Sequence, residues 1–288
     1  MSKMKYAFIG FLFVMPVCHL AAQESYKDQY LRLLRNGQFN ELKALLEKWE
    51  KAEPANPELY IGFFNYYCNL DAAEGTAMGK MPDGRYGVYA KREYNKKNVY
   101  EGIKYLDKGL AFAPNRLDMH WGKIELLFEI EDFKGAGETL FNVIEMSSKY
   151  NASWALGDNK PVDNGKNYFL GYVSRYYETL LNSPSDDAAN ALINCAQLQI
   201  KTYPESTFAY NILAVYYIYR DEYETALDYL LTAEKADGND YVILINIGRL
   251  YAEMKDNVKA KAYFDKTIRI GDAAAKKQAK SLIAYYKL

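Results

Sequence analysis

Two adjacent stretches near the C-terminal end decide the fold of this chain. Residues 206–239 read STFAYNILAVYYIYRDEYETALDYLLTAEKADGN, and residues 240–272 read DYVILINIGRLYAEMKDNVKAKAYFDKTIRIGD. At a shift of 34 positions, which places Ser206 on Asp240, the two align without a gap. The matched apolar pairs are Leu213 with Ile247, Tyr217 with Tyr251, Ala226 with Ala260 and Leu230 with Phe264. Apolar residues spaced by three and four predict two amphipathic helices in each stretch.

This period and this residue pattern resemble the tetratricopeptide repeat (TPR), a helix pair of 34 residues. The resemblance implies an all-α fold, a right-handed α-solenoid of about six TPR-like helix pairs closed by a C-terminal capping helix. The clearest repeats are 207–240 and 241–274, and the cap is 275–288. The fold serves many unrelated tasks, so the family implies protein–protein interaction only in general.

The 34-residue period exposes two insertions. Pro54, Pro114 and Pro204 each end a second helix of a repeat. The first interval is about 26 residues longer than one repeat, and the next about 22 longer than two. We therefore expect insertions at about 71–97 and 149–166, within a single solenoid domain that spans residues 23–288.

Aromatic residues in the insertions are candidate contacts for a partner. Tyr86, Tyr89 and Tyr94 lie in the first insertion, and Trp154 lies in the second. The alternative is that these rings pack beneath the insertions. Residues 79–81 and 85–89 flank a Pro-Asp-Gly turn signal, which predicts a short hairpin.

The first 22 residues are predicted to be a secretory signal peptide. Lys3 and Lys5 precede the apolar residues 6–17, and cleavage is expected after Ala22. The mature protein would then be exported to the periplasm or the extracellular space, without a transmembrane span. An uncleaved anchor is the alternative. A lipoprotein attached through Cys18 is disfavoured, because the residues before it match a lipobox poorly.

Composition and motifs disfavour several function classes. The chain has 36 basic and 37 acidic side chains, so no basic excess favours nucleic acid. After removal of the signal, His120 is the sole histidine, and a helix-surface role is expected for it. Cys68 and Cys195 are expected to be unpaired core residues. Phosphate-loop, nucleophile-elbow and calcium-loop patterns are absent, so we predict no catalytic residues, no metal site and no cofactor.

By analogy with the family, the first helix of each repeat lines a concave groove. The groove residues expected to bind the partner are Trp121, Glu125, Phe128, Phe208, Asn211, Val215, Tyr219, Asn246 and Arg249. Large aromatic residues and arginine dominate the energetics of protein interfaces. The family's carboxylate clamp is not expected, because Asn211 and Val215 stand where lysine and asparagine would be required.

Together these features favour a non-enzymatic scaffold or adaptor of the cell envelope that binds a peptide or protein in its concave groove. The alternative is an envelope protein that binds a glycan or another small ligand through exposed aromatics. A hydrolase built on the insertions is disfavoured by the residue inventory.

Overall fold

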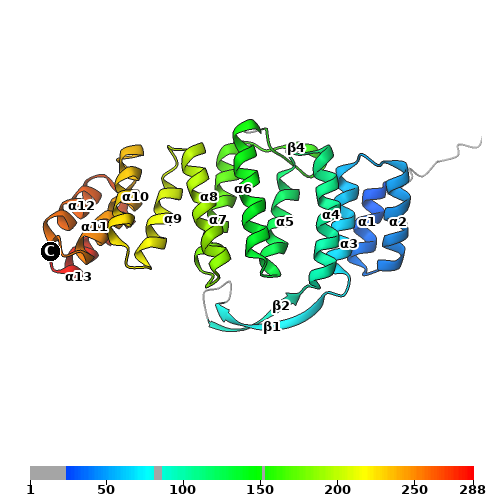
Figure 1. Ribbon diagram of the computed structural model, residues 1–288, viewed down its shortest axis with the longest axis horizontal. Helices are drawn as coiled ribbons and strands as arrows, with labels where there is room; N and C mark the ends of the chain where they lie inside the picture. Colours follow the sequence, from blue (N-terminus) through cyan, green and yellow to red (C-terminus); the bar gives the residue numbers. More distant parts are fainter. Residues whose placement is uncertain (1–23, 81–85, 151–152) are drawn as a thin grey trace, which may run out of the picture.

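The chain folds as a row of antiparallel helix pairs. The computed structural model describes residues 24–80, 86–150 and 153–288, and Figure 1 shows the pairs stacked side by side along the long axis. The helices are α1 (Tyr26–Arg35), α2 (Phe39–Ala52), α3 (Pro57–Asn69), α4 (Lys96–Phe112), α5 (Leu117–Glu129), α6 (Phe133–Tyr150), α7 (Gly165–Leu181), α8 (Asp186–Thr202), α9 (Thr207–Ile218), α10 (Tyr223–Ala236), α11 (Tyr241–Glu253), α12 (Asn257–Ile270) and α13 (Ala273–Tyr286). The protein is an α-solenoid, as the sequence predicts.

Side-chain caps fix where the helices begin. Ser25, Asn56, Asn95, Asp240 and Asp272 each accept a hydrogen bond from a backbone N–H in the first turn of the helix that follows. Such a cap satisfies a donor that has no partner within the helix. The caps therefore set the start of helices in several repeats independently of the packing between them.

The turn inside a repeat has a recurrent backbone conformation. Gly37, Asp71, Glu131, Asp221 and Lys255 all follow the first helix of a pair and have φ between 59° and 66°. A left-handed residue at this place lets its neighbours satisfy the last carbonyls of the helix. Only one of the five is a glycine, so packing between the two helices holds the others in a conformation that non-glycine residues seldom adopt.

Close helix contacts define the core. In the sixth repeat, a Cβ added to Gly248 of α11 would lie 2.7 Å from the ring of Phe264 in α12. Phe264 is fully buried, as are Leu213 and Leu230. A small residue at the position of Gly248 in both clear repeats therefore allows the two helices of a pair to pack closely.

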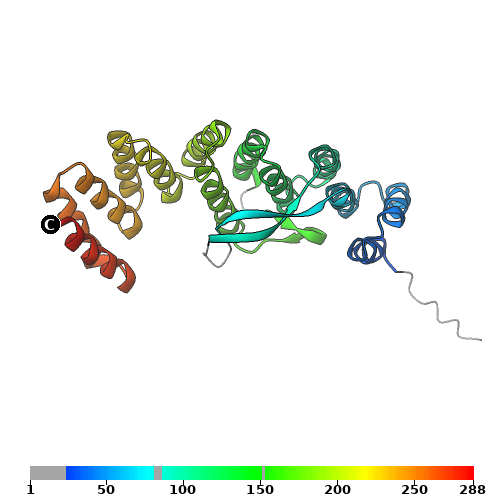
Figure 2. The same ribbon diagram turned by 90° about the horizontal axis from the view of Figure 1, so that it is seen from below.

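The first insertion is a β-hairpin. Strands β1 (Ala73–Lys80) and β2 (Tyr86–Glu93) pair antiparallel, with Ala77 opposite Tyr89. The hairpin is longer than the short pair expected from residues 79–81 and 85–89. It leaves the row of helices and runs along its lower margin in Figure 1, and in Figure 2, seen from below, it crosses the middle of the row. The turn predicted at Pro82-Asp83-Gly84 lies outside the described residues.

The second insertion folds back on the helices. It contains a single turn of 3-10 helix, η1 (Gly157–Asn159), between the two-residue strands β3 (Ala155–Leu156) and β4 (Lys160–Pro161). Trp154 is 1% exposed, so its side chain is not available to a partner, and the alternative that it packs beneath the insertion holds for this residue. Its ring stacks on Phe169 with the centroids 5.6 Å apart, and it anchors the insertion to α7.

The histidine and cysteines are interior residues. His120 is 7% exposed, and its Nε2 lies 3.0 Å from the carbonyl oxygen of Pro114. The prediction of a helix-surface role for His120 is therefore wrong, because the second insertion places Trp154 edge-on over its ring. Cys68 and Cys195 are buried and unpaired, as predicted. In the described ranges, no helix is long and apolar enough to cross a bilayer, and the predicted signal peptide lies outside them.

Candidate partner-binding surfaces

A pocket near the C-terminal end brings four of the predicted groove residues together. It has a volume of about 240 Å³ and lies between α9, α11 and α13. Val215, Tyr219, Asn246 and Arg249 all line it. The tyrosine ring is 72% exposed and Arg249 is exposed as well, so both are available for contact.

The remaining residues that line this C-terminal pocket were not among the predicted groove residues. They are Ile218, Tyr223, Leu250, Glu253 and Tyr286. The hydroxyl of Tyr286 donates to Glu253 Oε1 at 2.7 Å. Burial and this carboxylate raise the pKa of Tyr286 to about 12, so the hydroxyl remains protonated at neutral pH. The glutamate charge is thus partly satisfied within the protein, while Arg249 is exposed and lies close enough to Tyr286 to oppose the rise of its pKa.

Two amides are hydrogen-bonded beside the C-terminal pocket. Asn246 Nδ2 donates to Asn211 Oδ1 at 2.7 Å, which joins the first helices of repeats five and six. Phe208 does not reach the C-terminal pocket. It stacks on Tyr177 of the preceding repeat, with ring centroids 6.3 Å apart.

A second concavity, the central pocket, lies between α5 and α7. It has a volume of about 680 Å³, and Glu125, Phe128 and Tyr94 line it together with Arg175 and Tyr176. The Tyr176 hydroxyl donates to Glu125 Oε1 at 3.3 Å, and burial followed by this charge raises the pKa of Tyr176. The structure thus places the insertion residue Tyr94 beside two residues of the predicted groove.

Trp121 is not part of an accessible groove. Its side chain is 4% exposed and stacks on Tyr172 and Phe169, with centroid distances of 5.4 and 5.7 Å. The prediction that Trp121 contacts a partner is wrong, because α7 covers it. Tyr89 lies in β2 and is partly exposed, and the side chain of Tyr86 is outside the described part of the chain.

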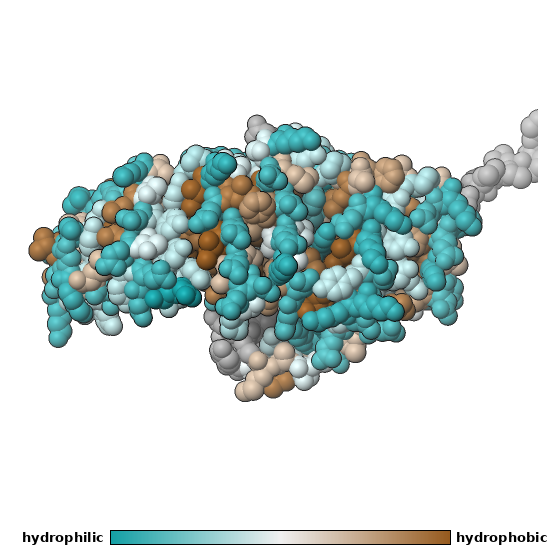
Figure 3. Space-filling model, viewed as in Figure 1, coloured by the Kyte–Doolittle hydropathy of each residue, from teal (hydrophilic) through white to brown (hydrophobic). Residues whose placement is uncertain are grey.

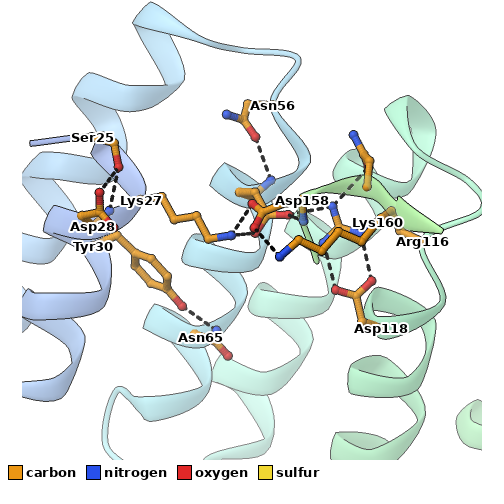
Figure 4. Close-up of polar contacts among 12 residues, drawn as sticks. Ser25, Lys27, Asp28, Tyr30, Asn56, Asn65, Arg116, Asp118, Asp158 and Lys160 are labelled. Atoms are coloured by element: carbon orange, nitrogen blue, oxygen red, sulfur yellow. Dashed lines mark hydrogen bonds and ion pairs between the residues drawn. The ribbon is translucent and has the colours of Figure 1, made fainter. Parts of the chain in front are cut away.

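A polar network ties the second insertion to three successive repeats (Figure 4). Arg116, at the N-terminus of α5, is fully buried and contacts Glu58 of α3 at 2.7 Å and Asp118 at 2.8 Å. Lys27 of α1 contacts Glu58 at 3.1 Å and also pairs with Asp158 of the insertion. The backbone N–H of Asp158 donates to Glu58 Oε1 at 2.9 Å. Glu58 is therefore the centre of the network.

These contacts shift the pKa values of the carboxyl groups. Burial alone would raise the pKa of Glu58, but the Asp158 N–H, Arg116 and Lys27 together hold it below its ordinary value. The pKa of Asp158 is lowered mainly by its hydrogen bond from Lys27. Both groups are thus anionic near neutral pH, where Lys27 and Arg116 compensate their charges.

A further shallow groove runs between α6 and α8. Its volume is about 730 Å³, and its lining includes Gly137, Phe141, Asn190 and Asn194. Figure 3 shows apolar surface between hydrophilic ridges over this middle part of the row of helices. In the described ranges, no group of three or more His, Cys, Asp or Glu side chains is placed to hold a metal ion.

The chain is similar to several solved structures at low sequence identity. No protein-family model matches the chain, and no curated protein matches it. Solved structures do match. The C-terminal part of a TPR protein from Cytophaga hutchinsonii is 15% identical over 91% of this chain and 88% of its own, with a TM-score of 0.45. PilF of Pseudomonas aeruginosa is 14% identical over 89% and 95%, with a TM-score of 0.36.

A third structure, YrrB, is described as a TPR protein with an unusual peptide-binding site. It is 16% identical over 82% of this chain and 97% of its own, with a TM-score of 0.39. At such identities and TM-scores the likeness carries no argument about a site. The class of protein is a TPR-like α-solenoid, and it rests on the helix pairs described above.

Proposed function

We propose that the protein is a non-enzymatic scaffold of the cell envelope that binds a peptide or protein partner in the C-terminal pocket. The observation that carries the proposal is the convergence of Val215, Tyr219, Asn246 and Arg249 on one concavity. Exposed tyrosine and arginine beside apolar surface are the residue types that supply most interface energy. The helix pairs beneath them are packed in advance, which lowers the entropic cost of binding.

The chemistry of the pocket favours a particular kind of segment. Val215 and Ile218 are partly exposed and offer apolar contact, whereas Arg249 offers a cation at the protein surface. Glu253 is engaged by Tyr286 at 2.7 Å and therefore opposes an incoming carboxylate less than a free glutamate would. An apolar side chain with an acidic neighbour fits this combination.

The location in the envelope rests on the signal-like residues 1–22. Positive residues, an apolar core and small residues before Gln23 follow the order of an export signal. Export is tested by mass spectrometry of the protein recovered from its host, which should begin at Gln23. An intact N-terminus on protein from the cytoplasm would refute this part of the proposal.

The binding role is tested by affinity purification from an envelope extract. The wild type should recover one protein in stoichiometric amount, and Tyr219→Ala and Arg249→Ala should each reduce recovery at least tenfold, as expected for interface anchors. Val258→Ala is the matched control, because Val258 is 83% exposed on α12 and outside the pocket. Recovery that is equal for all three variants would show that the partner binds elsewhere.

A further inference from the structure

One face of the β-hairpin is exposed along its length. Exposure alternates with a period of two: Thr76, Met78, Val88 and Ala90 are exposed, whereas residues on the other face, such as Tyr89, are partly covered. Met78 is 85% exposed and Val88 is 65% exposed, and the register places them directly opposite each other. Figure 3 shows apolar atoms at the lower margin of the molecule, where Figure 1 places the hairpin.

The hairpin has no third strand in the described part of the chain. Strand β1 pairs with β2, and these two strands form a sheet of their own. A two-stranded hairpin is at best marginally stable in water, and sheets gain stability by packing a face against another element. The exposed hairpin face (Glu74, Thr76, Met78, Val88, Ala90 and Arg92) is therefore a surface that a partner would stabilise.

The charges on the exposed hairpin face are complementary to those of a second copy. Glu74 and Arg92 stand opposite each other in the register, on the same face as Met78 and Val88. The Arg92 guanidinium lies over the ring of Tyr94, 5.9 Å from its centroid. Both charged side chains are exposed, so they can contact another molecule.

We propose that the exposed hairpin face is a self-association surface, on which two copies of the chain stack their hairpins face to face. The two copies are related by a two-fold axis that runs parallel to the strands. This axis places β1 of one copy over β2 of the other. The two hairpins are then about 10 Å apart, which is the ordinary distance between packed sheets. Glu74 then faces Arg92 of the second copy, and Met78 faces its Val88, each twice. The helices of the two copies remain on opposite sides of the stacked hairpins.

The size of this surface sets the strength of association. Eight residues per strand span about 27 Å, and two strands are about 10 Å wide. Such a contact buries less than the roughly 1,200 Å² in total that stable interfaces require. The dimer is therefore weak and depends on protein concentration. This surface is separate from the C-terminal pocket, so the two proposals can fail independently.

Sedimentation velocity of the purified protein over a concentration series tests the proposal. The wild type should shift from monomer to dimer in the high micromolar range, and Met78→Asp should remain a monomer throughout. Glu74→Arg and Arg92→Glu should each weaken the dimer about tenfold, because two exposed pairs become repulsive. The double variant Glu74→Arg/Arg92→Glu should restore it. The control is Glu101→Lys/Lys104→Glu, which swaps an exposed pair on α4.

Disulfide trapping then tests the orientation. An equimolar mixture of Met78→Cys and Val88→Cys should cross-link between chains faster than either variant alone, because the two-fold axis sets position 78 over position 88 of the other copy. The native Cys68 and Cys195 are buried and do not compete.

A wild type that stays monomeric at all concentrations would overturn the proposal. So would a dimer that is indifferent to Met78→Asp or a charge swap that fails to restore association. Tyr219→Ala should leave the dimer unchanged.

Discussion

At the residue scale, Arg116 is the most consequential polar side chain of the fold. It is fully buried and contacts Glu58 and Asp118, with a third polar contact to Asn159. A buried ion pair adds little net stability compared with an apolar replacement of both partners. Removal of only one partner is costly, because it leaves charges without compensation in the interior.

Arg116→Met should therefore destabilise the protein by about 3 kcal/mol. Lys104→Met removes a largely exposed lysine that pairs with Glu101 on α4, and it should cost less than about 0.5 kcal/mol. Urea unfolding followed by circular dichroism measures both. Hydrogen exchange should locate the loss in α1, α3 and α5. Equal stability of the two variants would show that the buried network does not contribute measurably to the free energy of unfolding.

The same network predicts a dependence of stability on pH. The folded-state pKa of Glu58 is below its ordinary value of 4.5. A depressed carboxyl pKa contributes stability that is present above the unfolded pKa and is lost as pH falls through the folded pKa. The melting temperature should therefore fall below about pH 4.5, and Glu58→Gln should have a lower melting temperature at pH 7 but a flatter profile in acid. A variant profile parallel to that of the wild type would contradict this assignment.

At the element scale, the repeats were more predictable than the insertions. Helix pairs follow from apolar spacing and a fixed period, which are local properties of the sequence, and α9 and α11 begin 34 residues apart, at Thr207 and Tyr241. The sequence predicted a β-hairpin in the first insertion, but a shorter one than the structure contains. Its strands contain Gly75, Gly79 and Gly87, which weaken any alternating pattern of hydrophobicity.

The burial of Trp121 and Trp154 depends on the position of α7. Both rings stack on Phe169 of α7. The position of α7 is set by the second insertion, and residues 158–164 include three non-glycine residues with positive φ: Asp158, Asn159 and Asn164. No periodicity specifies such a turn, so it was not possible to predict from the sequence which aromatic rings it would cover.

Trp154→Ala should detach the second insertion from α7. Loss of a fully buried tryptophan costs about 3–5 kcal/mol, because a cavity remains. Trp154→Phe retains a ring against Phe169 and should cost less than half as much. Hydrogen exchange of residues 153–163 is the measurement, and faster exchange there in Trp154→Ala is expected. Unchanged protection would mean that the polar contacts of Asp158 alone hold the insertion.

At the scale of the whole molecule, most contacts join helices that are close together in the sequence. Each helix pair packs on its neighbours, so no central core fixes one end relative to the other. The second insertion departs from this rule, because Asp158 reaches Lys27 and Glu58, which lie about 131 and 100 positions earlier in the chain. Repeats one to three are thereby tied together, and the C-terminal pocket lies on repeats without such a tie.

The central claim is that the C-terminal pocket holds the partner, and site-specific photo-crosslinking tests it most directly. A photoreactive phenylalanine analogue is placed at Tyr219, inside the pocket, or at Val258, which is 83% exposed on α12. After irradiation in the intact host, position 219 should give one discrete adduct, position 258 none, and Arg249→Ala should remove the adduct at 219. Equal adducts at both positions, or an adduct at 219 that persists in Arg249→Ala, would contradict the account.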